Sequence, residues 1–192
     1  MLTREENERL TRVGPGTPMG AMLREYWLPA CRSAKLEAEG APERVRLVGE
    51  DFVAYRSTDG RVGFIAEACP HRCASLVLAR NEGDGLRCIF HGWKFDAIAG
   101  QCVDTPTEPA ERRAEFAQKV PVKAYPAREG GGVVWVYLGR KAEPPPFPAY
   151  EFTQLPEGQV AAQRGIIRTN WLQGLEALLA SAHVTFLHTA PL

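Results

Sequence analysis

Two short stretches, CPHRCASL at 69–76 and CIFHGWKFD at 88–96, carry most of the information in this sequence. Each contains a cysteine followed two or three residues later by a histidine: Cys69 with His71, and Cys88 with His91. The chain has only four histidines, so the placement of two of them beside cysteines is a spacing typical of metal ligands. A proline inside the first stretch and a glycine after the second histidine favour tight loops. The pattern therefore predicts two metal-binding loops.

A two-iron two-sulfur cluster takes four protein ligands. Two neutral imidazoles in place of two thiolates make it easier to reduce, at about −150 to +300 mV against about −400 mV for the all-cysteine kind. A structural zinc ion is the alternative, but zinc fingers group their ligands as C-x-x-C and H-x-x-x-H and not as mixed pairs. Packed cysteines and histidines without metal are the third interpretation. The mixed pairs favour the cluster, whose chemistry is one-electron transfer.

The sequence around these loops predicts a small antiparallel β-sandwich or barrel. Between about residues 45 and 138, short apolar runs alternate with turn residues, as in RVRLVG, DFVAYR and GVVWVYLG. Asp59-Gly60 lies between two such runs and indicates a hairpin. We expect the two cluster loops to be presented by adjacent hairpins. The fold class is mainly β, with N-terminal helices and the start of an α+β domain after it.

Four segments follow from composition: an N-terminal helical segment at 1–27, a β domain at 28–140, a proline-rich linker at 141–159 and the start of a second domain at 160–192. A capping box at Thr3 and Glu6 predicts a helix over 3–12, and Thr17-Pro18 predicts a second helix to residue 26. The stretch 159–170 resembles a strand. Leucines at helical intervals predict one helix over 170–188.

Beyond the two loops, the opening MLTREENERLTRVGPGTPMG, the run VRLVGEDFVAYR and the segment EALLASAHVTFLH at 176–188 are similar to the phthalate dioxygenase-like oxygenase subunits of the Rieske ring-hydroxylating oxygenases. The resemblance covers nearly the whole chain. It implies a Rieske domain that takes electrons from a flavin and iron-sulfur reductase. In that family the electrons pass to a mononuclear Fe(II) that activates O2 for attack on a small aromatic acid, in aromatic compound catabolism. It also implies a homo-oligomer, typically a trimer.

The same resemblance assigns roles around a second metal. His183 and His188 match two of the three ligands of the mononuclear iron, and two imidazoles on one segment suit a two-His-one-carboxylate site. Asn170 and Glu176 stand where the family has an Asn and an acidic residue near this iron. Ala180 replaces the acidic residue that connects the two metal centres of neighbouring subunits, and an alanine cannot accept a hydrogen bond. The resemblance assigns no other catalytic residue.

Composition restricts the partners and the compartment. Lys plus Arg and Asp plus Glu are 23 each, so no net field favours nucleic acid or an anionic membrane. No apolar run has the length of a signal peptide or a membrane span, and we expect a cytoplasmic protein with reduced thiols. Cys31, Cys73 and Cys102 are then passive small residues. We expect Trp93 to pack beside the cluster.

Three functions remain open from the residues alone. The first is an oxygenase component, and the second is a stand-alone Rieske ferredoxin-like electron carrier without substrate chemistry. The third is a fragment of a longer protein whose remainder holds the third iron ligand, a carboxylate, and the substrate pocket. Iron content per chain separates the first two, because a cluster alone contains about two irons.

Overall fold

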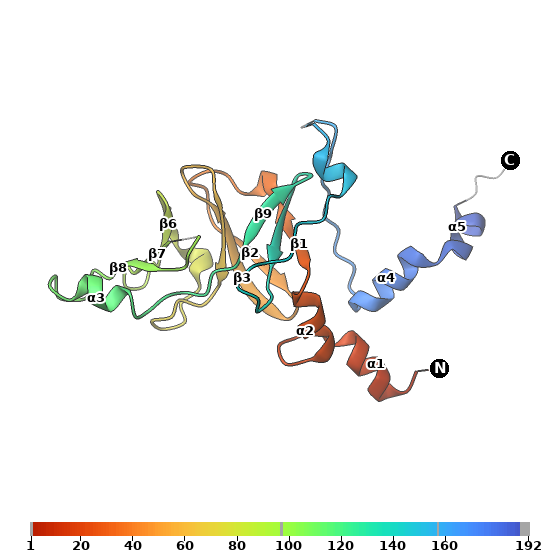
Figure 1. Cartoon of the computed structure of the whole chain (residues 1–192), viewed down its shortest axis with the longest axis horizontal. Coiled ribbons are helices and arrows are strands. Elements are labelled where there is room, and N and C mark those ends of the chain that lie inside the picture. Colours follow the sequence, from red (N-terminus) through yellow and green to blue (C-terminus); the bar gives the residue numbers. More distant parts are fainter. Residues whose placement is uncertain (1, 97, 157, 189–192) are drawn as a thin grey trace.

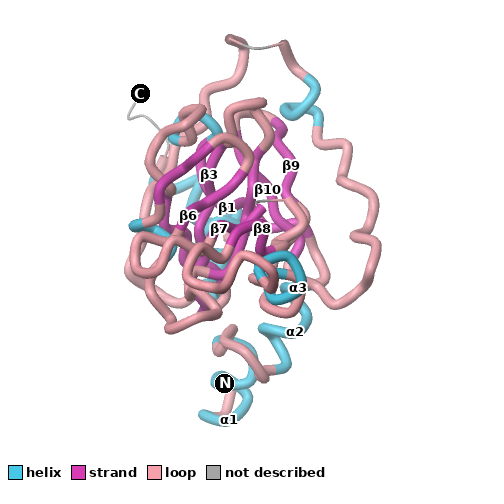
Figure 2. The backbone as a smooth tube through the Cα atoms, turned by 90° about the vertical axis from the view of Figure 1, so that its left-hand side faces the viewer, coloured by secondary structure: helices cyan, strands magenta, loops and turns pink. Residues whose placement is uncertain are grey.

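The computed structural model describes residues 2–96, 98–156 and 158–188, and it consists of a β body with helices at both ends of the chain (Figure 1). Helix α1 (Arg4–Thr11) begins at a complete capping box between Thr3 and Glu6, and α2 (Pro18–Arg24) is capped by Thr17. Both predicted N-terminal helices are therefore confirmed. In Figure 2 they lie together below the strands.

The β body contains three antiparallel sheets. The first has the order β1 (Trp27–Arg32), β10 (Val133–Tyr137), β9 (Ala127–Gly130), and the second has the order β2 (Glu43–Leu47), β3 (Glu50–Arg56), β4 (Val62–Ala66). The third contains β5 (Arg80–Glu82), β6 (Gly85–Arg87), β7 (Lys94–Asp96) and β8 (Cys102–Asp104). The predicted mainly β fold class is confirmed, although β1, β5 and β9 were not among the expected strands.

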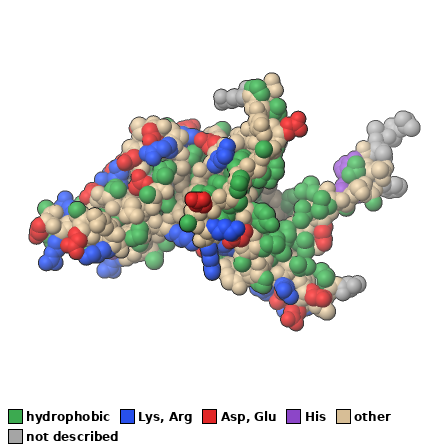
Figure 3. Space-filling view, in the orientation of Figure 1, with side chains coloured by type: hydrophobic (Ala, Val, Ile, Leu, Met, Phe, Trp, Pro, Cys, Tyr) green, Lys and Arg blue, Asp and Glu red, His purple; other side chains and the backbone are tan. Residues whose placement is uncertain are grey.

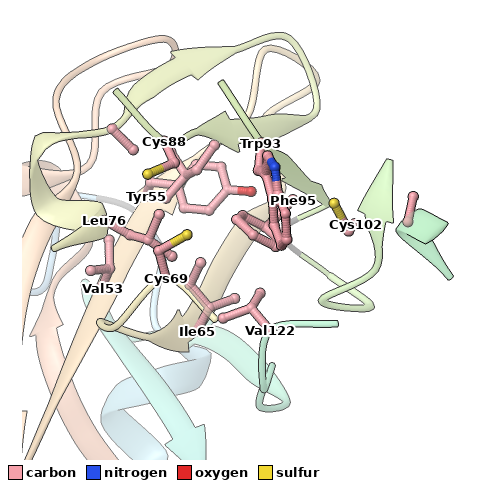
Figure 4. Packing of buried hydrophobic residues seen from close by; sticks show 13 residues of the cluster. Val53, Tyr55, Ile65, Cys69, Leu76, Cys88, Trp93, Phe95, Cys102 and Val122 are labelled. Atoms are coloured by element: carbon pink, nitrogen blue, oxygen red, sulfur yellow. The ribbon is translucent and has the colours of Figure 1, made fainter. Parts of the chain in front are cut away.

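Strand β3 is buried on both faces and divides the interior into two cores. Because successive side chains of a strand point to opposite faces, Phe52 and Ala54 enter one core while Val53 and Tyr55 enter the other. The first core lies between the β1 and β3 sheets and includes a tilted Phe52–Phe64 ring pair with centroids 5.1 Å apart. The second lies under the four-stranded sheet and includes both candidate cysteine ligands, as Figure 4 shows.

Short 3-10 turns and one helix complete the β body. The turns are η1 (Ser33–Lys35) and η2 (Leu76–Leu78), and a third, η3 (Glu151–Gln154), follows the proline-rich stretch. Helix α3 (Arg113–Ala117), which the sequence did not predict, follows β8. It contributes Phe116 and the buried Ala117 to the core beside the cysteines.

The proline-rich stretch packs against the first sheet. Phe147 meets Trp27 edge-on, with ring centroids 5.6 Å apart, and the Trp27 indole N–H donates to the Pro145 carbonyl at 2.8 Å. Arg128 of β9 lies over the Phe147 ring, 4.6 Å from its centroid. These contacts fix the proline-rich stretch to the β body, and its role as a linker between two domains stays a prediction.

Two expectations for the C-terminal part were wrong. The segment 159–170 forms no strand, because its backbone has no neighbouring strand with which to pair, and Ile166 and Ile167 are each 79% exposed. The helical run divides into α4 (Trp171–Leu179) and α5 (Ser181–Leu187) at Ala180, which has φ −74° and ψ 84°. Helix α4 lies against α1, and the Trp171 indole donates to the Leu10 carbonyl at 3.0 Å.

Candidate metal centre

The two cysteine-histidine loops leave the β body side by side but differ in origin. The second loop connects β6 to β7 and is a hairpin loop, as expected. The first connects β4 of one sheet to β5 of another and is closed by an isolated bridge between Ala68 and Ser75. The expectation of two adjacent hairpins is therefore wrong for the first loop, because it crosses between sheets.

Despite this difference, both loops make the same turn. The Cys69 carbonyl accepts from the Cys73 N–H at 2.8 Å, and the Cys88 carbonyl accepts from the Gly92 N–H at 3.0 Å. The fourth residue after each cysteine has a left-handed φ, +55° at Cys73 and +75° at Gly92. A Cβ at Gly92 would come 2.8 Å from Pro106 Cγ, so both the turn and the close approach require glycine there.

We expected Cys73 to be a passive small residue that packs as a buried free cysteine does, but its side chain is exposed. Its backbone adopts a conformation that costs a residue with a Cβ about 1–2 kcal/mol. The cysteine therefore imposes strain on the first loop that the glycine of the second loop avoids. Cys31 and Cys102 are buried as expected, and burial raises the pKa of the Cys31 thiol to about 11.

Replacing Cys73 with glycine should therefore raise the free energy of unfolding by up to about 1 kcal/mol, since relief of the left-handed strain exceeds the added flexibility of the unfolded chain. Urea unfolding of the cluster-loaded protein measures it. Cys73→Ala is the matched control, because alanine removes the thiol but retains the strain. Equal stabilisation by both variants would contradict the backbone explanation.

The four candidate ligands converge where the loops meet. Cys69 is 1% and Cys88 3% exposed, and Cys88 lies close enough to raise the pKa of the Cys69 thiol. The imidazoles of His71 and His91 are half-buried, with ring centroids 4.3 Å apart and ring planes at 65°. The structure therefore brings one Cys-His pair from each loop to a common place.

One observation indicates that this arrangement fits a two-iron cluster. His71 Nδ1 is buried and has no hydrogen-bond partner among the described residues, so this nitrogen is available to a metal. Each iron of the cluster takes only two ligands from the protein, and the site offers two cysteines and two histidines. In the described part of the chain, no group of three or more His, Cys, Asp or Glu side chains is placed to hold a single metal ion.

Electrostatics at Cys69 and His71 shift the two pKa values in opposite directions. Burial raises the pKa of Cys69 to about 11, an effect that Cys88 increases and the backbone N–H groups of His71 and Arg72 oppose. Burial lowers the pKa of His71, with His91 and Arg72 adding to the shift. Burial therefore favours the neutral imidazole, which is the form that binds metal, and opposes the thiolate, whose charge a bound cation would offset.

Arg87, the residue before Cys88, holds the second loop in place. Its guanidinium donates to the carboxylates of Glu82 at 2.6 Å and Asp104 at 2.8 Å, and to the carbonyl of Gly92 at 2.6 Å. One side chain thus connects the base of the loop, its left-handed turn and strand β8. Sequence reasoning missed this role, because a basic residue beside a ligand is usually a solvated surface residue.

His183 and His188 form a second pair on α5 and its C-terminal residue. Their ring centroids lie 5.5 Å apart, with ring planes at 70°. Helix α5 lies at the opposite end of the molecule from β6 and β7, which flank the second Cys-His loop (Figure 1), and histidine side chains are visible in purple at that C-terminal end in Figure 3. The third ligand of an iron here is not among the described residues, and iron ligation by these histidines stays a prediction.

The neighbouring residues with predicted roles make local contacts in α4. Asn170 caps the helix by accepting from the Gln173 N–H at 3.0 Å, and Glu176 accepts from the Gln173 side chain at 3.2 Å. Ala180 provides no side-chain cap for α5. Because the helix breaks at Ala180, Glu176 lies on α4, whereas the two histidines lie on α5 and its C-cap residue. The roles of Asn170, Glu176 and Ala180 near an iron stay predictions.

The chain matches the family model of the Rieske [2Fe-2S] domain over residues 26–126. It is 47% identical over 192 residues to the 3-chlorobenzoate-3,4-dioxygenase oxygenase subunit of Comamonas testosteroni, covering 100% of this chain and 44% of that protein. It is 45% identical over 191 residues to the phthalate 4,5-dioxygenase oxygenase subunit of Pseudomonas putida, covering 99% of this chain and 43% of that protein. The chain thus spans less than half the length of these relatives.

Among solved structures, the chain resembles the carbazole-bound oxygenase and ferredoxin complex of carbazole 1,9a-dioxygenase, with a TM-score of 0.69 and 26% identity over 84% of this chain and 41% of that one. It also resembles dicamba monooxygenase bound to dicamba, with a TM-score of 0.55 and 29% identity over 65% of this chain and 37% of that one. No helix in the described part of the chain is long and apolar enough to cross a bilayer.

Proposed function

Because the chain belongs to the Rieske [2Fe-2S] domain family, we propose that it is the electron-transferring part of an oxygenase subunit that acts on a small aromatic acid. Its cofactor is a Rieske two-iron two-sulfur cluster. We propose that Cys69 and Cys88 bind one iron of this cluster and that His71 and His91 bind the other. When bound, the cluster supplies a one-electron redox couple.

The observation that carries the proposal is the convergence of the four side chains, with a buried His71 Nδ1 that lacks a partner among the described residues. The buried cysteines keep one side of the site dry, while the half-buried imidazoles place the other side near the surface. Ile89 and Phe90, 55% and 59% exposed, precede His91 in the second loop and place apolar groups on that surface. Electrons would enter and leave through the imidazole side.

We assign the donor to an iron-sulfur protein, a ferredoxin or a flavin-containing reductase, that docks at this surface. Support comes from the solved oxygenase and ferredoxin complex of carbazole 1,9a-dioxygenase, which the chain resembles. The acceptor is a mononuclear iron held by His183 and His188. Because the histidine pair and the loops lie at opposite ends of one chain, the electron would pass to another copy in a homo-oligomer, for which a trimer is the expected form.

The exposed leucines of the C-terminal helices favour the interpretation that these helices belong to a larger catalytic domain. Leu178 of α4 is 86% exposed, and Leu179 and Leu187 are each 72% exposed. Apolar side chains at these positions gain stability when covered. In the longer relatives we expect additional chain to cover them and to provide the third iron ligand.

The test is electron paramagnetic resonance of the dithionite-reduced protein combined with iron analysis. A Rieske-type signal with about two irons per chain supports the cluster. About three irons, falling to about two in His183→Ala, supports an occupied second site as well. A ferredoxin signal of the all-cysteine type, or no signal, would overturn the cluster assignment. A Rieske signal with only about two irons per chain in the wild-type protein would overturn the mononuclear iron at His183 and His188 and favour a simple electron carrier.

A further inference from the structure

Trp93 and His71 come from different cluster loops, yet their rings are stacked. The ring centroids are 4.3 Å apart and the planes differ by only 7°. Because the two rings are nearly parallel and in contact, the imidazole cannot turn out of its present plane without breaking the stack. The other imidazole, His91, instead meets Phe90, an exposed ring tilted by 46° at 4.1 Å. The two histidines are therefore held unequally.

Trp93 is itself held from behind. It is 3% exposed, its indole N–H donates to Thr107 Oγ1 at 3.2 Å, and Phe116 of α3 meets its ring edge-on at 5.5 Å. Both supports come from the segment that follows β8, outside either cluster loop. The same segment contributes Pro106, which lies against Gly92. The segment thus fixes the plane of Trp93, and Trp93 in turn contacts His71.

We propose that Trp93 is a positioning residue that fixes the plane of the His71 imidazole on its iron, and that Thr107 and Phe116 hold the Trp93 ring in place. This inference rests on the proposed cluster. The orientation of an imidazole on iron affects the electronic structure of the cluster, and the buried indole excludes water from that side. Trp93 would therefore set the reduction potential without touching iron.

The expected shift has a definite sign. With two thiolates and two neutral imidazoles, reduction adds one negative charge to the cluster, and water stabilises the more highly charged state. Trp93→Leu opens space beside His71 to water and frees the ring. We expect a more positive reduction potential and broader features in the resonance spectrum of the reduced protein, at unchanged iron content.

Three variants make the test decisive. Thr107→Val keeps the shape of the support but removes the acceptor, so it should move the potential in the same direction by less than Trp93→Leu does. Trp171→Leu is the matched control: Trp171 also donates its indole N–H, at 3.0 Å to Leu10, but it lies on α4 at the other end of the molecule. It should leave both measurements unchanged.

Wild-type spectrum and potential in cluster-loaded Trp93→Leu would overturn the positioning role while leaving the cluster assignment intact. If Trp93→Leu does not retain iron, Thr107→Val decides: a shifted potential supports the role, and a wild-type potential overturns it. A wild-type protein without a Rieske signal would instead refute the proposed function itself. The two failures are thus distinguishable.

Discussion

Replacing Cys88 with alanine should abolish the cluster, with the iron content falling by about two atoms per chain and the Rieske signal lost. Alanine has no atom that can bind iron, and the partner thiol Cys69 lies in the same buried place, where burial alone opposes the thiolate. A single remaining thiolate cannot hold its iron against that cost. Iron analysis and resonance spectra of the purified variant measure the effect.

Cys102→Ala is the matched control for this prediction. Cys102 is also buried, in the same core as Cys88, but its thiol points to the Asp104 carbonyl at 3.5 Å and belongs to neither loop. It should retain the full iron content and the wild-type spectrum. A cluster that survives Cys88→Ala, or is lost from Cys102→Ala, would contradict the ligand assignment.

The second large effect is expected at Phe95, the side chain of β7 at the centre of the core beneath the loops. It is fully buried and belongs to the same core cluster as Tyr55, Leu86 and Trp93. Figure 4 labels Phe95 together with Tyr55 and Trp93. Phe95→Ala leaves a cavity as well as losing buried apolar surface, so the free energy of unfolding should fall by about 3–5 kcal/mol. Denaturant unfolding monitored by circular dichroism measures the loss.

Phe90→Ala provides the comparison, since Phe90 belongs to the same hairpin and is 59% exposed. Its truncation removes no buried core, and we expect a change within about 0.5 kcal/mol, as for other surface substitutions. Similar losses in the two variants would show that Phe95 does not form the core under the cluster loops.

Local patterns in the sequence were sufficient for several features. The spacing of Cys69, His71, Cys88 and His91 predicted the metal loops, because ligands close in sequence are close in space whatever the rest of the fold does. The capping box at Thr3 and Glu6 and the cap at Thr17 predicted two helices for the same reason. Alternating apolar residues predicted most of the strands.

Features that depend on distant partners were missed or wrong. The segment 159–170 has a strand-like pattern but no neighbour with which to pair. Strand β1 contains a proline and pairs with β10 across a register shift between Pro29 and Cys31, so its pattern is weak. The left-handed φ of Cys73 and its exposure arise from the hydrogen bond that closes the first loop.

The sequence by itself determined the mainly β class and the family and predicted the ligand set, since each depends on residue identity and short spacings. Only the tertiary structure decided how the ligands are held: the stack of Trp93 on His71, the Arg87 contacts to Gly92, and the distance of His183 from the cluster loops along the molecule. These contacts join residues from separate loops and strands, and their geometry is set by the packing of three sheets around two cores. The spacing of apolar residues along the chain indicates whether a segment is a helix or a strand. It does not indicate which segments pack against one another.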